Sequence, residues 1–167
     1  FSFPSFSETE RRAARARLAF PYRTGLLTFR EAPALLKAIR LLKTAPDLFL
    51  FDGQGIAHPR RAGLAAHLGV VLNLPSVGCA KPHLYGDFEP PGRERGCFSW
   101  IRSPKGEKIG AAVRTRTGVN PVFVSPGNRV DLRTSIRVVL ACGNGYRVPL
   151  PLREAHLFCE GQKREAA

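Results

Sequence analysis

Short apolar runs and stretches of helical spacing alternate along the chain. Residues 48–51 form a continuous apolar run, Leu-Phe-Leu-Phe, which is typical of a strand buried on both faces of a sheet. Pro59 predicts the start of a helix that runs to about Leu72, and residues 76–80 can form the next buried strand. This order of strand, helix and strand predicts a βαβ unit with parallel strands.

Two helices are predicted before the first of these strands. Residues 26–42 carry apolar side chains at helical spacing, and Thr28 with Glu31 matches a capping box. A helix beginning at Thr28 would place Pro33 beyond the positions where its missing N–H is harmless, so we expect the helix to begin near Glu31. Residues 7–19 are rich in Ala, Arg and Glu, which favours a helix by propensity, although their apolar positions form no stripe.

The second half of the chain predicts a hairpin, a further strand and two helices. In chain order these are residues 99–102, 109–114, 121–124 and 131–141, followed by a helix from about Leu152 that carries His156. Asp131 is suited to cap the first of these helices, and residues 160–167 are expected to form a frayed tail. The order of elements predicts an α/β fold, a mixed sheet flanked by helices, in one domain over residues 1–167.

The balance of charge indicates an anionic partner. The 167 residues include 26 Lys and Arg against 13 acids, which gives a formal charge of +13, and 44% are hydrophobic, enough for a core. Nucleic acid is the expected partner, because no apolar run reaches the roughly 18–20 residues that span a bilayer. We therefore expect no membrane partner. We also expect a monomer, and a cytoplasmic location because the first residues show no secretory leader.

The cysteines are widely spaced and form no C-x-x-C pair, so neither a zinc knuckle nor a redox motif is indicated. Free or buried thiols are expected at Cys79, Cys97, Cys142 and Cys159.

The start of the sequence suggests an expectation about what precedes it. The chain contains no methionine and begins with Phe1, so position 1 is not expected to be the natural start. The opening Phe-Ser-Phe-Pro-Ser-Phe is typical of the middle of a strand and turn, and at least one earlier strand is expected to be missing.

One acid stands where α/β sheets place their ligands. Asp52 follows the predicted strand at residues 48–51, and ligands of open α/β sheets collect at the carboxyl ends of strands. An isolated Asp-Gly pair is more often ordinary turn chemistry. A site is favoured here because other polar residues also lie near element ends, namely Glu31, Lys81, His58 and His156. Carboxylates suit Mg²⁺ or Mn²⁺, ions that activate water and stabilise phosphate charge during strand cleavage.

Four segments carry motifs in a specific order. They are P-Y-R-T-G-L-L-T-F-R-E at residues 21–31, F-D-G-Q-G-I-A-H-P-R-R-A-G-L-A-A-H at 51–67, S-V-G-C-A-K at 76–81 and R-E-A-H at 153–156. Together they resemble the endonuclease V family, over nearly the whole chain. The resemblance implies an RNase H-like fold, here without its first strand or strands. It also implies a DNA-repair endonuclease that needs Mg²⁺ and cuts on the 3′ side of a deaminated base, chiefly hypoxanthine.

The resemblance also implies roles for individual residues. Glu31 and Asp52 match two of the family's metal-site carboxylates, and Lys81 and His156 match its active-site lysine and histidine. Tyr22 matches an aromatic wedge, which would fill the gap that an extruded base leaves in the stack. The other residues expected to contact the nucleic acid, largely around the extruded base, are Gly25, Leu27, Gly53, Gly55, His58, Gly63 and Leu84.

Three departures from the family pattern matter. The family's other metal-binding aspartate lies on a strand before the matched part, so the chain as it stands is expected to cut poorly. Arg23 and Thr24 replace a common Ile-Pro in the wedge loop, and Asn128 replaces a common histidine, which is expected to alter a phosphate contact. The alternatives are a nucleic-acid-binding protein without cleavage, a ribonuclease for inosine-containing RNA, and a basic structural protein of a ribonucleoprotein.

Overall fold

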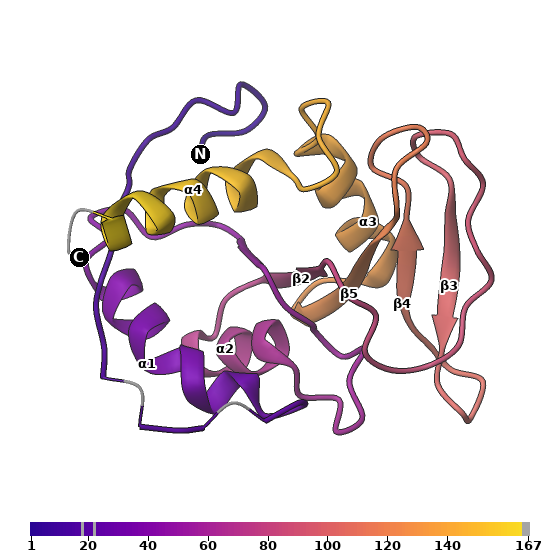
Figure 1. Cartoon of the computed structure of the whole chain (residues 1–167), viewed down its shortest axis with the longest axis horizontal. Helices are drawn as coiled ribbons and strands as arrows, with labels where there is room; N and C mark the ends of the chain where they lie inside the picture. Colours follow the sequence, from indigo (N-terminus) through magenta and orange to yellow (C-terminus); the bar gives the residue numbers. More distant parts are fainter. Residues whose placement is uncertain (18, 22, 165–167) are drawn as a thin grey trace.

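The computed structural model describes residues 1–17, 19–21 and 23–164. The elements, in chain order, are α1 (Leu27–Arg40), β1 (Phe49–Phe51), α2 (Leu64–Leu72), β2 (Ser76–Ala80), β3 (Phe98–Arg102), β4 (Lys108–Val113), β5 (Val122–Asn128), α3 (Leu132–Ala141) and α4 (Leu150–Arg164). Figure 1 shows the β3–β4 hairpin at one end of the molecule and α1 and α4 toward the other. Among the helices of the described residues, none is long and apolar enough to cross a membrane.

One mixed sheet joins the strands of the described chain in the order β1-β2-β5-β4-β3. β1 and β2 are parallel, with Phe51 opposite Gly78, whereas the other neighbouring pairs are antiparallel. α2 connects β1 to β2, which confirms the predicted βαβ unit, and β3 with β4 confirms the predicted hairpin. β5 continues past the predicted end at residue 124, because it pairs along the whole of β2. The mixed α/β sheet with flanking helices is as predicted.

Both faces of β2 are covered. Val77 and Cys79 belong to an apolar cluster that includes Val139 of α3. On the other face, the Ser76 hydroxyl donates to the Ala65 carbonyl of α2 at 2.8 Å. Since successive side chains of a strand point to opposite faces, α2 and α3 cover opposite sides of the sheet. This double burial explains why the strand carries no alternation of polar and apolar residues.

The start of α1 differs from the prediction. The helix begins at Leu27 and not near Glu31, and its N-cap residue Leu26 makes no side-chain hydrogen bond. Thr28 is buried within the helix, so the capping box that its spacing to Glu31 matches does not form. Pro33 lies inside the helix but on its exposed side, where the backbone carbonyl that loses its partner can contact water.

The start of α2 also differs. The helix begins at Leu64 and not at Pro59, and the residues between them form an irregular turn. The Gly63 N–H donates to the Gly55 carbonyl at 3.0 Å, and Arg61 has a left-handed φ of +57°. These two features are incompatible with a helix, so the Pro59 signal marks a turn here.

The described part of residues 7–19 forms neither helix nor strand, contrary to the predicted helix. The Glu10 carboxylate accepts a hydrogen bond from the Lys43 N–H at 3.0 Å, just after α1. The Arg11 guanidinium lies over the Phe158 ring of α4, 4.9 Å from its centroid. Contacts with two helices therefore override the helix propensity of this segment.

The C-terminal helices agree with the prediction except at the end of the chain. Asp131 caps α3, because its carboxylate accepts from the Thr134 N–H at 2.9 Å. α4 continues to Arg164, so the part predicted to fray is helical as far as the structure describes it. The Lys163 amine, 2.6 Å from the Glu160 carboxylate one turn earlier, supports this last turn.

The thiols are free, as predicted. Cys79 and Cys142 are buried, and burial raises the pKa of both. A thiol with a raised pKa is a poor nucleophile and a poor metal ligand at neutral pH.

A substitution at Gly55 tests how tightly the loop after β1 packs against β5. A Cβ atom at this position would lie 1.9 Å from the Pro126 carbonyl oxygen. Gly55→Ala should lower the free energy of unfolding by about 1–3 kcal/mol, because the core cannot accept the added methyl group without a shift. Gly161→Ala is the control, since a Cβ there meets nothing within 4 Å, and it should stabilise α4 by about 0.5–1 kcal/mol. Equal urea midpoints for the two variants would contradict the packing argument.

Candidate functional site

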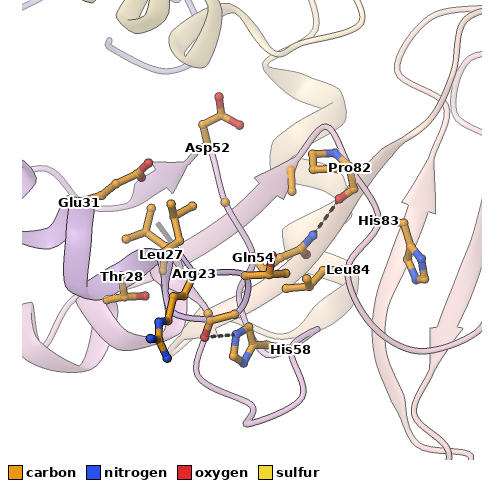
Figure 2. A pocket seen from close by; sticks show the side chains of 16 residues that line it. Arg23, Leu27, Thr28, Glu31, Asp52, Gln54, His58, Pro82, His83 and Leu84 are labelled. Atoms are coloured by element: carbon orange, nitrogen blue, oxygen red, sulfur yellow. Dashed lines mark hydrogen bonds between the residues drawn. The ribbon is translucent and has the colours of Figure 1, made fainter. Parts of the chain in front are cut away.

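A cavity of about 420 Å³ lies at the carboxyl ends of β1 and β2 (Figure 2). Three segments build it: the loop and first turns of α1, the loop after β1 and the loop after β2. Their lining residues are Arg23, Thr24, Gly25, Leu27, Thr28, Glu31, Asp52, Gly53, Gln54, His58, Gly63, Leu64, Ala80, Pro82, His83 and Leu84. We call this space the carboxylate cavity, because Glu31 and Asp52 both line it.

The two carboxylates interact electrostatically across the cavity. Glu31 projects from α1 on the same side as Leu27, four residues earlier, and Asp52 directly follows β1. The pKa of Glu31 is raised, first by burial and then by the negative charge of Asp52. The structure therefore brings together the two acids that the sequence placed in one site, although they lie on different elements.

Lys81 joins this pair, whereas His156 does not. The Lys81 amine lies 2.8 Å from the Asp52 carboxylate, with both side chains about 40% exposed (42% and 40%). Exposed ion pairs of this kind contribute little to stability. The main effect of this pair is therefore to keep the positive charge of Lys81 beside the acids. His156 is exposed on α4 and is not among the described residues that line the cavity. Its predicted catalytic role stays a prediction.

Most of the residues predicted to contact nucleic acid line the same cavity. They are Gly25, Leu27, Gly53, His58, Gly63 and Leu84. Gly25 has a φ of +76°, a conformation that L side chains rarely adopt. Gly55 is buried below the cavity, where its N–H donates to the Ser125 hydroxyl at 2.8 Å. Tyr22, the predicted wedge, lies outside the described residues.

His58 links two of the three segments. The Arg60 N–H donates to His58 Nδ1 at 3.1 Å, so Nε2 must carry the proton of the neutral ring. Nε2 then donates to the Gly25 carbonyl at 3.0 Å. The pKa of His58 is lowered, chiefly by burial, and the nearby Arg60 adds to this, while the bond to Gly25 opposes it. A neutral imidazole thus ties the α1 loop to the loop after β1.

Gln54 is a lining residue that the sequence did not reveal. Its Nε2 donates to the Pro82 carbonyl at 3.0 Å, which ties the loop after β1 to the loop after β2, as the dashed line in Figure 2 marks. Its Oε1 is buried and has no hydrogen-bond partner among the described residues. The available signal was a polar residue between two glycines directly after a buried strand.

The departure at Asn128 lies away from the cavity. Its side-chain amide donates to the carbonyls of Gly69 and Leu74, at 3.0 and 3.2 Å, near the end of α2. Asn128 pairs with Ser76 at the start of β2, whereas the cavity lies beyond the end of that strand. This amide therefore has a structural role, and the expected change in a phosphate contact stays a prediction.

The geometry agrees with comparisons to known proteins. The family model described as Endonuclease V matches residues 1–157. The chain belongs to the endonuclease V family. An endonuclease V from Methanothrix thermoacetophila is 56% identical over 141 residues, which cover 84% of the chain and 62% of that relative. The chain thus spans less than two thirds of that relative's length.

Solved structures of endonuclease V share this fold. The crystal structure of the Bacillus subtilis protein is 38% identical, has a TM-score of 0.86 and covers 92% of the chain and 66% of its own. A Ciona intestinalis endonuclease V is 28% identical with a TM-score of 0.86, and covers 99% and 77%. That protein was crystallised with a 24mer DNA containing an inosine followed by a ribo-adenosine. The RNase H-like fold expected from the motifs is confirmed.

The electrostatic contact between Glu31 and Asp52 can be tested by titration. Asp52→Asn should lower the pKa of Glu31, because it removes one of the two causes that raise it. NMR titration of the Glu31 side-chain carboxyl group measures this change. Asp47→Asn is the control, since Asp47 is exposed and is not among the causes of the Glu31 shift. An unchanged pKa in the Asp52 variant would show that the two carboxylates do not sense one another.

The same shift has a consequence for stability. A folded-state pKa above the unfolded value means that the ionised Glu31 destabilises the folded state relative to its protonated form. The stability contributed by the protonated Glu31 is complete below the unfolded pKa and is lost as the pH rises through the folded pKa. Relative to Glu31→Gln, the chain should therefore lose unfolding free energy as the pH rises across this interval.

Proposed function

We propose that this chain carries the site of a Mg²⁺-dependent endonuclease, which cuts a nucleic-acid strand on the 3′ side of a deaminated base, chiefly hypoxanthine. The observation that carries the proposal is the pair of acids, Glu31 and Asp52, lining one cavity at the ends of β1 and β2. Membership of the endonuclease V family supports it. The inosine-containing DNA in the Ciona intestinalis structure supports the choice of substrate.

The donor set fits Mg²⁺. This ion is commonly held by one or two carboxylates together with water and substrate phosphate oxygens. Glu31 and Asp52 are hard oxygen ligands, and the repulsion that raises the pKa of Glu31 would be relieved by a cation between them. When bound, Mg²⁺ supplies positive charge to the phosphate and makes its bound water more acidic.

The chain's own residues then bind and orient the strand. The Lys81 amine places a positive charge beside Asp52, where the phosphate to be cut would lie. Backbone groups at Gly25 and Gly53 would contact the extruded base, and the bond from His58 to Gly25 keeps the first of these in place. Tyr22 as the wedge and His156 as an active-site group complete the proposal by the family pattern.

A second candidate function is nucleic-acid binding without cleavage. It is favoured by one observation: within the described ranges, no group of three or more His, Cys, Asp or Glu side chains could hold a metal. The charge of +13 supports binding in either case. The cleavage assay compares DNA with inosine-containing RNA as the strand that is cut.

A cleavage assay distinguishes these functions. Matched strands with hypoxanthine or adenine, as DNA and as RNA, are incubated with Mg²⁺ or with a chelator. The assay uses the chain alone and the chain joined to the part of the Methanothrix thermoacetophila relative outside the match, because the chain spans 62% of that relative. We expect the joined chain to cut the hypoxanthine strand only with Mg²⁺, and the chain alone to cut it poorly. Asp52→Asn should slow it on the order of 100-fold or more, since each 1.4 kcal/mol of lost transition-state stabilisation is about tenfold in rate.

Asp47→Asn is the matched control and should cut at the parent rate. Binding without cleavage, both by the chain alone and by the joined chain, would favour the second candidate function. Cleavage that survives both the chelator and Asp52→Asn would overturn the metal-nuclease proposal.

A further inference from the structure

A second cavity, of about 410 Å³, lies beside the carboxylate cavity at the same edge of the sheet, where β2 and β4 end and β5 begins. Three cations line it, Lys81, Arg114 and Arg147, together with Phe88, Phe123 and Asn120. Of the described residues that line it, none is acidic. We call this space the arginine cavity.

Backbone carbonyls hold the two arginines in place. Arg147 donates from Nε to the Asn120 carbonyl at 2.9 Å and from Nη2 to the Lys81 carbonyl at 2.8 Å. Arg114 donates from Nη2 to the Pro91 carbonyl at 2.9 Å. Within the described part of the chain, neither arginine pairs with a carboxylate. Each guanidinium uses three of its five N–H donors in bonds to carbonyls, so both groups keep positive charge and two donors for a ligand.

Lys81 and His83 connect the two cavities. Lys81 lines the arginine cavity while its amine contacts Asp52 of the carboxylate cavity. His83, two residues later, lines the carboxylate cavity and packs on the rings behind it, with centroids 5.0 Å from Phe88 and 5.3 Å from Phe123. The same aromatic cluster therefore forms a wall of both cavities.

We propose that the arginine cavity binds the nucleotide next to the one held in the carboxylate cavity. Its phosphate contacts Arg147 and Lys81, and its sugar or base packs against Phe88 and Phe123. The inference rests on the proposed function and extends it from one nucleotide to the neighbouring position on the strand.

The composition of the cavity matches a nucleotide better than a simple anion. Sites for single strands combine cations that follow the backbone with aromatic rings that contact the bases. The arginine cavity supplies both, and its volume lies in the range of roughly 300–1,000 Å³ of small-ligand pockets. A free phosphate would use the cations alone, whereas a nucleotide would also contact the rings of Phe88 and Phe123 that line the cavity.

Asn120 provides a test that leaves the arginine bonds intact. Its carbonyl accepts from Arg147, but its exposed side chain lines the cavity, so a charge can be introduced there without removing that bond. The probe is a single-stranded oligodeoxynucleotide with one central hypoxanthine, bound without divalent ions so that no strand is cut. Asn120→Glu should weaken binding about fivefold, and Asn120→Lys should strengthen it and steepen the salt dependence by roughly 0.7 in the log–log slope.

The matched control is Asn144→Glu, which adds the same charge at an exposed residue outside the lining set and should bind like the parent. Two truncated probes, lacking the nucleotides 5′ or 3′ of hypoxanthine, locate the subsite. Asn120→Glu should weaken binding of the full strand and of only one truncated probe.

The two proposals fail in different ways. Equal binding by Asn120→Glu and Asn144→Glu, or an equal loss of affinity for all three probes, would overturn the proposal for the arginine cavity. A parent chain that binds hypoxanthine and adenine strands equally would count against the proposed function, while the contrast between the two Asn variants still decides the site. Unchanged thermal unfolding of each variant shows that binding and not folding has been altered.

Discussion

The site depends on backbone packed directly against backbone at the end of β1. The loop of residues 53–55 lies between Gly63, before α2, and Gly78, in the middle of β2. A Cβ atom on Gly63 would lie 2.3 Å from the Gln54 carbonyl oxygen, and one on Gly78 would lie 2.5 Å from the Gly55 nitrogen. Only glycine permits this approach. It lets β1 and β2 end side by side, so Asp52 meets Lys81 and the cavity opens above them.

The two cavities at this edge have opposite electrostatic character. In the carboxylate cavity, Asp52 opposes the ionisation of a half-buried Glu31, whereas the arginine cavity holds cations without a carboxylate. Lys81 lies on the boundary and contributes to both. A cation would be favoured on one side and a phosphate on the other, which is the arrangement that a strand needs when one of its phosphates is to be activated.

The sequence predicted those parts of the fold and site that depend on local chemistry. The strands at residues 48–51 and 76–80 could be predicted because burial on both faces leaves uninterrupted small or apolar runs, and Asp52 because it follows one of them. The predictions for the start of α1 and for the segment around Glu10 were wrong, since tertiary contacts outweigh capping and propensity signals there. Gln54 and Arg147 were missed because their partners are carbonyls far away in sequence, at Pro82 and Lys81.

Side chains that donate to distant carbonyls give the site its rigidity. His58 holds Gly25, Gln54 holds Pro82, and Arg147 holds Lys81, so each loop around the two cavities is tied to another. Loops closed in this way lose little further entropy when a ligand binds, which favours affinity. Arg147 differs from the others, because a charged donor both fixes the Lys81 backbone and adds to the field that attracts phosphate. A neutral residue at position 147 that preserved the loop bonds would therefore still leave the second cavity with less attraction for a strand.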